Sequence, residues 1–494
     1  MAIQRRSFIS NAAAMSALLA TGISTQTKSR ASTTRNSTLP APDADTLTLN
    51  RTTFGITQAL KNKIRKVGRK RWLESQMNWK DLDDTRTEAY LQKNMPTLYM
   101  SPQELSNLEN KNQAAKQLVQ ATVYRAMFSK RQLYEVMVEF WSNHFSIYIR
   151  DGRPVSLLKT IDDREVIRPH ALGNFRELLR ASSKSPAMLI YLDNHSNVAG
   201  TANENYAREL MELHSLGVNG GYTETDVKEV ARCFTGWTVG RFGSPQLGKF
   251  IFASTKHDQG QKSVLGTIIP ANGGMSDGEQ VIDLLASHPS TAKYISTKLV
   301  RRFVADEPPP SLVDQLTETF IATDGDIKAL LWDIFLSNEF LTSADQKLKR
   351  PLEFMLSAMR TLDTIPSRQS SNYLRNILFS MGHIPFNWTP PDGFPDAAEY
   401  WASSNGLLTR WNYATALTGN RIPGLKFDYQ TLTDNNRDPK TLVTILANRV
   451  LHRPLSNADE MLFVRYLSRG KPSIQARIPG LIGLMLASNY FQYR

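Results

Sequence analysis

The stretch SPQELSNLENKNQAAKQLVQATVYRAMFSKRQLYEVMVEFWSNHF, residues 101–145, decides the fold class. Ser101 is placed to cap a helix, Pro102 suits the first helical turn, and Glu104 completes a capping box. Apolar residues then recur at helical spacing to the end of the stretch. This pattern predicts consecutive helices that each bury an apolar face.

The same helical spacing recurs along most of the chain, with few strand signals between. The exception is 248–270, in which two short apolar runs flank a polar turn and predict a β-hairpin. Strands and helices do not alternate, so a doubly wound sheet is not expected. The predicted fold is mainly α, a large multi-helix globular domain with a short β-hairpin insertion around 248–270. Further helices are predicted at 159–180, 275–287, 290–304, 310–322, 347–361, 438–450, 455–468 and 474–489.

The first residues have the layout of an export signal. Arg5 and Arg6 precede a weakly apolar run that is too short and too rich in small polar residues to span a bilayer. Paired arginines of this kind are read by the twin-arginine exporter, which predicts a signal peptide over 1–31. The alternative is a basic disordered tail. Export would place the protein in the periplasm or outside the cell.

After the signal, a linker is expected at 32–42 and one mainly helical domain at 43–494. The 494 residues are 41% hydrophobic and 21% charged, which is typical of a globular protein. Later apolar runs are too short for a membrane span, so no transmembrane segment is expected in the mature protein. Within the domain, the segment 383–412 is rich in tryptophan and proline, and predicts a rigid plug on the core or a surface presenting aromatic rings to a ligand.

Charge and cysteine content exclude several classes of protein. The formal charge is +13, and removal of residues 1–31 leaves +9, because that segment carries four positive charges and no acid. The remaining positive charges are spread along helices, so nucleic acid is not an expected partner. Cys233 is the only cysteine, which rules out an internal disulfide and a multi-cysteine zinc or iron–sulfur site.

The stretch NENYARELMELHSLG, residues 203–217, concentrates charge on a short helix that Gly217 is expected to end. At about 100° per residue, Glu209 and Glu212 share a polar face, whereas His214 falls on the apolar stripe. His214 is therefore predicted to be a core histidine bonded to a backbone group. Two interpretations of the polar face remain open. It is a solvated helix surface, or it is a site that another segment covers.

Arg208 and Asn205 lie on that polar face beside the two glutamates. If the face is buried, an arginine between acids keeps them ionised, which suits the positioning of an anion or carboxylate. On a solvated face, the same four-residue pairs are ordinary helix design, worth about 0.2–0.5 kcal/mol each.

Three further segments bear on this choice. His144 ends the apolar helix of FWSNHF, and His257 and Asp258 occupy the turn of 248–270, where side chains can converge. Thr223 and Asp226, in GGYTETDVKEV, are predicted to form a capping box.

The motifs FWSNHF, NENYARELMELHSLGVNGGYTETDVKEVARCFTGW, KHDQGQKSVLG and PPDGFP, in this order, resemble the large bacterial family catalogued as domain of unknown function 1800. The resemblance runs from LNRTTFG at 49–55 to the C-terminus. It implies an exported, mainly helical protein and supplies no catalytic residue. It also implies, by association alone, an exported partner of family 1501, which looks like the sulfatase and alkaline-phosphatase fold.

Two functions follow from these observations. The first is an exported metal- or acid/base-dependent enzyme, hydrolytic or oxidative, whose pocket gathers the segments 139–145, 203–217 and 255–260. Its candidate cofactor is a divalent metal, for which histidine and carboxylate ligands suit zinc, manganese or iron. The second is a non-catalytic binding or assembly protein that acts with the sulfatase-like partner or a polysaccharide. The candidate residues of the first are Glu209, Glu212 and Asp258 as catalytic groups, Asn205 and Arg208 as cofactor-binding groups, and His144 and His257 as metal ligands.

Overall fold

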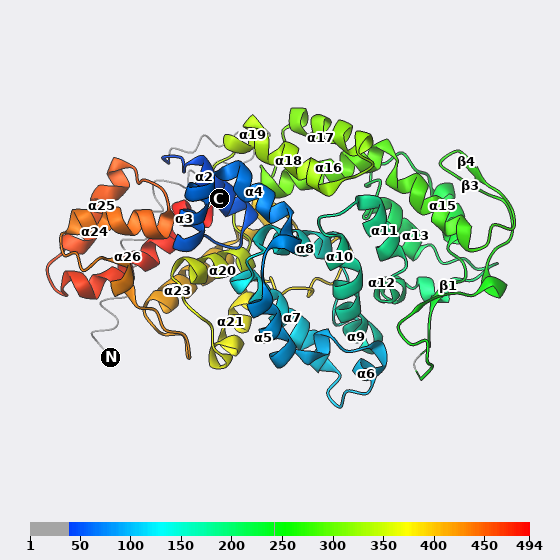
Figure 1. Ribbon diagram of the computed structural model, residues 1–494, viewed down its shortest axis with the longest axis horizontal. Coiled ribbons are helices and arrows are strands. Elements are labelled where there is room, and N and C mark those ends of the chain that lie inside the picture. Colours follow the sequence, from blue (N-terminus) through cyan, green and yellow to red (C-terminus); the bar gives the residue numbers. More distant parts are fainter. Residues whose placement is uncertain (1–38, 242) are drawn as a thin grey trace. The chain divides into compact units, whose positions relative to one another are not determined.

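The computed structural model describes residues 39–241 and 243–494, and in them the chain is mainly helical (Figure 1). The predicted fold class is confirmed, since the only strands in this part of the chain form two small antiparallel pairs. The predicted signal peptide, and the linker up to residue 38, lie outside the described residues. In the described part, no helix is both long and apolar enough to cross a membrane.

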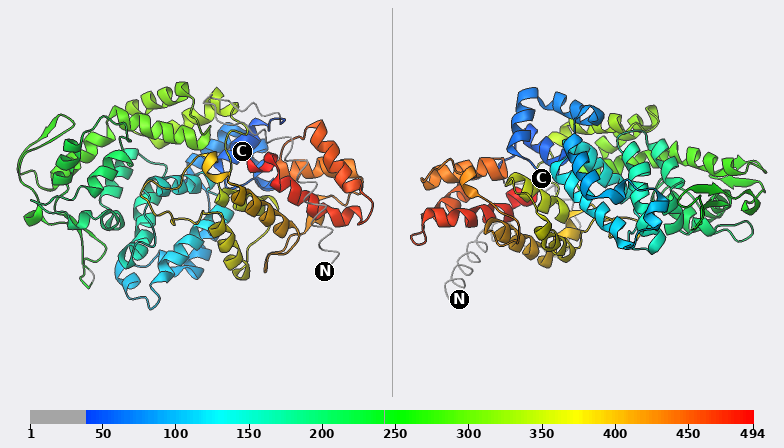
Figure 2. Two further views of the ribbon diagram at one scale, coloured as in Figure 1. Left: turned by 180° about the vertical axis from the view of Figure 1, so that it is seen from behind. Right: turned by 60° about the horizontal axis from the view of Figure 1, so that its bottom comes forward.

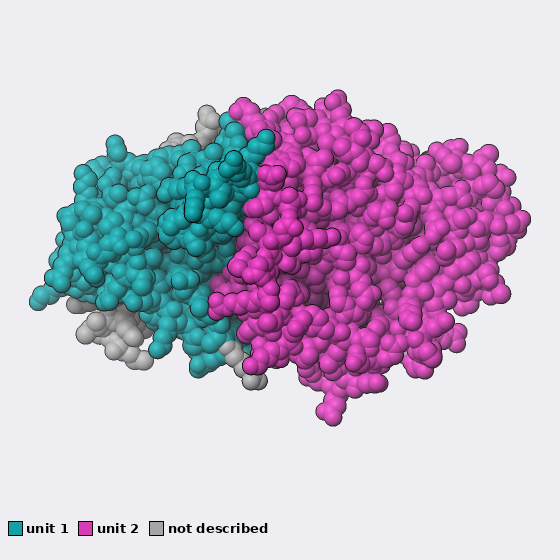
Figure 3. Space-filling view, viewed as in Figure 1, with its two compact units in different colours: residues 1–72, 341–383, 397–494 teal, residues 73–340, 384–396 magenta. Residues whose placement is uncertain are grey.

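The chain forms two compact units, although the sequence indicates one domain over 43–494 (Figure 3). Among the described residues, unit 1 comprises 39–72, 341–383 and 397–494, and unit 2 comprises 73–340 and 384–396. The chain enters and leaves each unit more than once. A boundary of this kind is set by which helices pack together, so it needs no proline-rich or glycine-rich linker that the sequence would reveal.

Unit 2 contains most of the helices that carry the predicted site. Its elements include α5 (Thr85–Asn94), α6 (Pro102–Ser106), α7 (Asn112–Phe128), α8 (Gln132–His144), α9 (Arg153–Asp162), α10 (Arg168–His170), α11 (Phe175–Ser183), α12 (Pro186–Tyr191), α13 (Asn205–Glu212), α14 (Glu224–Cys233), β1 (Trp237–Val239), β2 (Phe250–Phe252), β3 (Lys262–Val264), β4 (Thr267–Ile269), α15 (Met275–Ala286), α16 (Pro289–Phe303), α17 (Pro310–Ala322) and α18 (Ile327–Leu336). Helices α16 and α17 lie side by side, as the light-green segments also do when seen from behind (Figure 2).

Unit 1 is built from the two ends of the chain and a middle segment. Its elements include α2 (Ala44–Thr52), α3 (Gln58–Val67), α20 (Pro351–Thr361), α21 (Arg368–Ser380), α22 (Ala398–Trp401), α23 (Ser404–Thr418), α24 (Pro439–Leu446), the π-helical turn η7 (Ala447–Leu451), α25 (Asn457–Ser468), α26 (Ile474–Ala487) and α27 (Asn489–Gln492). Helix α4 (Arg69–Met77) runs from unit 1 into unit 2, and α19 (Asn338–Leu341) leads back. Every residue of α20 is buried, and the helix packs against α23 of the same unit.

The predicted helix starts are confirmed in detail. Both capping boxes are present, from Ser101 to Glu104 and from Thr223 to Asp226, each with reciprocal hydrogen bonds between side chain and backbone. The helix expected to continue from Ser101 is nevertheless broken between α6 and α7. The Asn110 side chain accepts a hydrogen bond from the Asn112 amide there, at 3.1 Å, because asparagine competes with the helical backbone for its donors.

The predicted hairpin insertion is present, but the two apolar runs expected to pair with each other do not do so. Strands β3 and β4 form the hairpin, with Ser263 opposite Ile268. The earlier apolar run is β2, which pairs with β1 instead, so that Ile251 lies opposite Thr238. The aromatic rings explain this choice, because Trp237 stacks edge-on against Phe250 with ring centroids 4.9 Å apart.

The tryptophan- and proline-rich segment 383–412 divides between the units. Residues 384–396 belong to unit 2, and the rest belongs to unit 1. In unit 1, the buried Trp401 stacks on His383 with ring centroids 5.0 Å apart, as expected of a plug on a core. The part in unit 2 contributes to the candidate site.

Candidate functional site

Helix α13 ends at Glu212, one turn earlier than the position of Gly217 suggests. The amides of Leu213 and His214 both bond to the Glu209 carbonyl, at 2.9 and 3.1 Å, which widens the last turn. Gly217 has φ +81°, and a side chain there would meet the ring of Tyr294. Because of the wide turn, the His214 side chain leaves the chain in a different direction from that in a regular helix. The residue is nevertheless buried, as predicted.

His144 and His214 form a buried pair that is electrically neutral. The His144 Nε2 donates to the His214 carbonyl at 3.1 Å, and the His144 Nδ1 has no hydrogen-bond partner in the described residues. Burial, and then the positive charge of Lys298, lower the pKa of His214 to about 3 and that of His144 well below its usual range. The sequence predicts a hydrogen bond from the His214 ring to a backbone group, but the ring Nε2 has no partner in the described residues. The His214 backbone carbonyl instead accepts the hydrogen bond from the His144 ring.

Arg208 and Asn205 lie on the outer side of α13. Arg208 makes a bidentate ion pair with Glu224 of α14, at 2.7 Å for both bonds, and a longer contact of 3.3 Å with Glu204. The Asn205 amide donates to the Leu192 carbonyl at 3.3 Å. The charged face is therefore covered in part by α14 and not by 248–270. Since Arg208 is one-third exposed, these pairs contribute little to stability.

Glu209 is half-buried, and its carboxylate has no hydrogen-bond partner in the described residues. Burial raises the pKa of Glu209, the negative charges of Glu212 and Asp392 raise it further, and Arg208 opposes them. Glu212 accepts a hydrogen bond from the Tyr222 hydroxyl at 3.2 Å. A carboxyl that is partly desolvated, beside a second acid and without a donor, has the environment of a proton-transfer group.

Lys298 of α16 is a basic group near Asp392, the acid that also acts on Glu209. It is partly buried, its Nζ lies 5.3 Å from the Tyr294 ring centroid, and no described residue accepts a hydrogen bond from it. Burial, and then the nearby Arg301, lower the pKa of Lys298 to about 8, while Asp396 and Asp392 oppose the shift. The surrounding residues, KLVRR, indicate only a solvated basic face, so the sequence gives no signal that would single out this lysine.

The loop 388–396 places Asp392 near Glu209 and Lys298. Side chains from neighbouring helices fix the loop through hydrogen bonds to its backbone. The Asn143 side chain makes two hydrogen bonds with Phe394, donating to its carbonyl at 2.9 Å and accepting from its amide at 2.7 Å. The Tyr191 hydroxyl donates to the Thr389 carbonyl at 2.7 Å. Trp388 donates to Asp392 at 2.7 Å, so the ring orients the acid. The motif PPDGFP therefore contributes an acid through a rigid loop.

His257 and Asp258 belong to a different cluster. His257 lies between the Thr235 carbonyl, 2.8 Å from Nδ1, and Asp277 of α15, 3.0 Å from Nε2. Lys262 of β3 donates to the same Asp277 oxygen at 2.6 Å, and all three side chains are fully buried. His257 and Lys262 thus share one Asp277 oxygen, and the other, Oδ1, is buried without a hydrogen-bond partner in the described residues. This cluster links β3 and α15 to the segment that follows α14.

Asp258 is held by Arg232 of α14, through contacts of 2.8 and 3.1 Å. The Arg232 guanidinium lowers the pKa of the Asp258 carboxyl, which keeps it ionised and paired. The contacts of 255–260 are thus with α14, α15 and β3, whereas 139–145 contacts 203–217 directly. The structure brings together two of the three predicted segments.

The metal-binding expectation has no support in the arrangement of ligands. His144 contacts His214, and His257 contacts Asp277, so the two imidazoles have no common carboxylate. Throughout residues 39–241 and 243–494, no group of three histidine, cysteine or acidic side chains has the geometry to hold a metal ion.

The fold and the site define a mainly helical protein whose larger unit holds Glu209 and Lys298, with perturbed pKa values, near Asp392. The chain belongs to the family described as protein of unknown function (DUF1800), whose model matches residues 47–493. The match confirms the resemblance drawn from the motifs. No curated protein and no solved structure matches the chain.

Proposed function

We propose that the protein is an exported acid–base hydrolase whose proton-transfer groups are Glu209 and Lys298. One observation carries the proposal. An acid with a raised pKa and an amine with a lowered pKa both lie near Asp392, and neither has a hydrogen-bond partner in the described residues. Perturbed groups of opposite kind that remain unpaired are typical of catalytic sites, because a structural role would pair them.

The shifts suggest a role for each group near neutral pH. Glu209 as the carboxylate takes a proton from water, whose oxygen attacks the electrophilic carbon of an ester or glycosidic bond. Lys298 as the ammonium gives its proton to the departing oxygen. Glu212, Asp392 and Asp396 make the surroundings acidic, which favours a neutral or cationic substrate over an anionic one. Tyr294 packs beside Lys298 and maintains its partial burial.

The test uses 4-nitrophenyl esters and 4-nitrophenyl glycosides as substrates of the full chain. Glu209→Gln should reduce kcat/KM by about 10²-fold or more, because the amide cannot accept the proton. The rate should rise with pH as Glu209 ionises and fall above about pH 8 as Lys298 loses its proton. Lys298→Met should lower the rate and remove the fall at high pH.

Matched controls occur on neighbouring helices of the same unit. Glu224→Gln removes the exposed acid that pairs with Arg208, and Lys293→Met removes an exposed lysine from α16. Both should retain wild-type rates and the same pH profile. Equal rates for wild type and Glu209→Gln, or no turnover of either substrate class, would reject the hydrolase and favour the binding or assembly role.

Export by the twin-arginine route is the second part of the proposal, and it is supported by the paired arginines before Phe8. Replacement of both Arg5 and Arg6 by lysine should retain the chain in the cytoplasm at its full precursor length. Replacement of Lys28 and Arg30 by glutamine should leave export unchanged. Cell fractionation with an antibody to the mature chain measures both. Undiminished export of the Arg5/Arg6 variant would contradict this route.

A further inference from the structure

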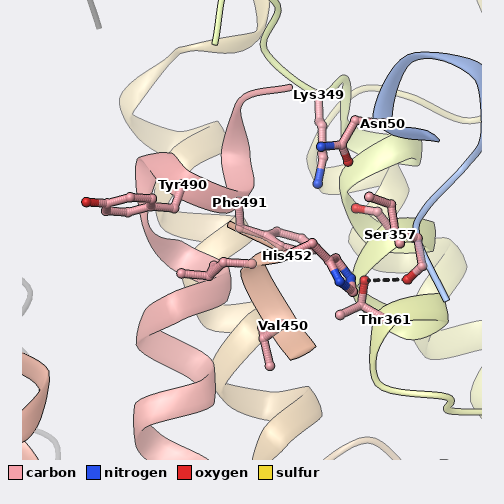
Figure 4. A pocket seen from close by; sticks show the side chains of 10 residues that line it. Asn50, Lys349, Ser357, Thr361, Val450, His452, Tyr490 and Phe491 are labelled. Carbon is pink, nitrogen blue, oxygen red and sulfur yellow. Dashed lines mark hydrogen bonds between the residues drawn. The ribbon is translucent and has the colours of Figure 1, made fainter. Parts of the chain in front are cut away.

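Positive charge is concentrated in three stretches of the sequence, KNKIRKVGRKR (61–71), KLVRR (298–302) and KLKR (347–350). The structure separates them by exposure. All of KLKR is buried, and Lys349 lies inside unit 1 with its Nζ 3.6 Å from the Phe491 ring centroid (Figure 4). In KLVRR, Arg302 is buried and the other two basic residues are partly buried. Of the three stretches, only the first presents a dense positive charge to solvent.

This first stretch covers most of α3 and the start of α4, which meet at Gly68 (Figure 1). Gly68 has φ +83°, a conformation that ends α3 and lets α4 begin at the next residue. Ile64 on α3 and Trp72 on α4 are fully buried. Lys61 also turns inward, and its Nζ donates to the His452 carbonyl at 3.1 Å. The opposite faces of both helices are left in solvent.

The exposed charge is called here the α3–α4 basic face, which is defined by Lys63, Lys66, Lys70 and Arg71. None of these side chains has a hydrogen-bond or ion-pair partner in residues 39–241 and 243–494. The sequence from 58 to 72 contains no acid. Arg65, beside the face, lies 3.8 Å from Asp43 of α2, and both side chains are more than half exposed, so this pair neutralises little of the charge.

The electrostatics of the two helices explain only part of this charge. Lys66 is in the last turn of α3, where the negative end of the helix dipole favours a cation. Lys70 and Arg71 are in the first turn of α4, which contains no acid, and the positive end of the dipole disfavours them there. Exposed charge that is unfavourable for its own helix indicates a role in binding an external anion.

The composition of the face fits an extended anionic surface better than a single small anion. Positions 63 to 71 span at most about 29 Å, so the four cations can meet one surface together. Three of the four are lysines, whose compact, hydrated charge suits many phosphate groups without a fixed geometry, whereas arginine forks suit specific sites. The exposed residues of 61–71 include no aromatic or apolar side chain, so the contact is electrostatic.

We propose that the α3–α4 basic face binds the phosphate headgroups of an anionic phospholipid bilayer and holds the exported protein at the membrane surface. The choice of a bilayer rests on the export proposed above, because an exported chain meets this surface as it leaves the cytoplasm. The contact does not depend on the hydrolase in unit 2. Each lysine or arginine near such a surface contributes about fivefold in affinity, so the four together contribute roughly 10²–10³-fold.

Co-sedimentation of the full chain with vesicles of phosphatidylglycerol and phosphatidylcholine tests the proposal. We expect binding that rises with the fraction of phosphatidylglycerol and is much weaker with phosphatidylcholine alone. Binding should decrease strongly between about 0.1 M and about 0.5 M NaCl, since salt screens exposed charges. The segment 1–31 is the same in every chain compared, so differences between variants report on the face.

The test variant carries glutamine at all four positions of the face and should bind phosphatidylglycerol vesicles about 10²-fold or more weakly. The control variant carries glutamine at four other exposed cations of unit 1, Arg421, Lys426, Arg437 and Lys440. It loses the same net charge, but from a segment that also contains Asp428, Asp434 and Asp438. The control should therefore lose no more than about threefold in affinity. Circular dichroism checks that both variants fold.

Three results would overturn the proposal. The first is wild-type chain that binds phosphatidylglycerol vesicles no better than phosphatidylcholine vesicles. The second is a test variant with the vesicle affinity of the control; if the test variant does not fold, the Lys70→Gln/Arg71→Gln chain replaces it and should lose about tenfold or more. The third is tighter binding to soluble poly-L-glutamate than to vesicles of equal negative charge, which would identify an acidic polypeptide as the partner instead.

Discussion

Asp277→Ala should destabilise unit 2 by about 3–5 kcal/mol, because it leaves the buried Lys262 without its acid. His257 loses its Nε2 partner in the same variant. The remaining oxygen contacts of Lys262 are with Asp258, through its carbonyl and, at 4.0 Å, its carboxylate. The midpoint of urea denaturation, followed by circular dichroism, measures the loss.

A matched control exists on the same helix. Asp283 of α15 pairs with Arg176 and Arg180 at the surface, so Asp283→Ala should cost about 1 kcal/mol or less. A combined Asp277→Leu and Lys262→Met variant should recover much of the lost stability, since it removes the buried charges together. Equal losses for Asp277→Ala and Asp283→Ala would show that the buried group contributes no more than a surface pair.

Gly393→Ala should detach the loop 388–396 from α8, at a cost of about 3 kcal/mol or more. A methyl group at this position would overlap the Asn143 carbonyl oxygen and lie 2.9 Å from its side-chain oxygen. The backbone there has φ +77°, which itself costs an L-residue about 1–2 kcal/mol. The two hydrogen bonds between Asn143 and Phe394 are also at risk, each worth about 0.5–1.5 kcal/mol.

Limited proteolysis of the loop, together with the thermal midpoint, measures this effect. Gly200→Ala is the control, because Gly200 has φ +82° and open space around it, so only the backbone penalty applies. Gly393→Ala should be cleaved within 384–396 well before the control. Cleavage rates that match would mean that the close approach to Asn143 does not hold the loop.

The candidate site could be predicted only in part. Glu209 and Glu212 follow from helical spacing, since residues three apart share a face whatever surrounds them. Lys298 and Asp392 come from segments about 90 and 180 residues farther along the chain, and nothing in KLVRR or PPDGFP indicates that Asp392 lies near both Glu209 and Lys298. The polar turn of His257 and Asp258 predicts that both enter the same pocket. In the structure, His257 instead hydrogen-bonds to Asp277, and Asp258 pairs with Arg232.

The sequence alone determined the helical class, the capped helix starts, the burial of His214 and the family, because each depends on residues close together or on long contiguous motifs. The tertiary structure decided which strand pairs with β2, where the two units divide the chain, and which charged groups remain unpaired. These outcomes depend on packing between distant segments. A charged side chain has the same local pattern whether it meets water, an opposite charge or an empty pocket, so only the fold distinguishes a site from a surface.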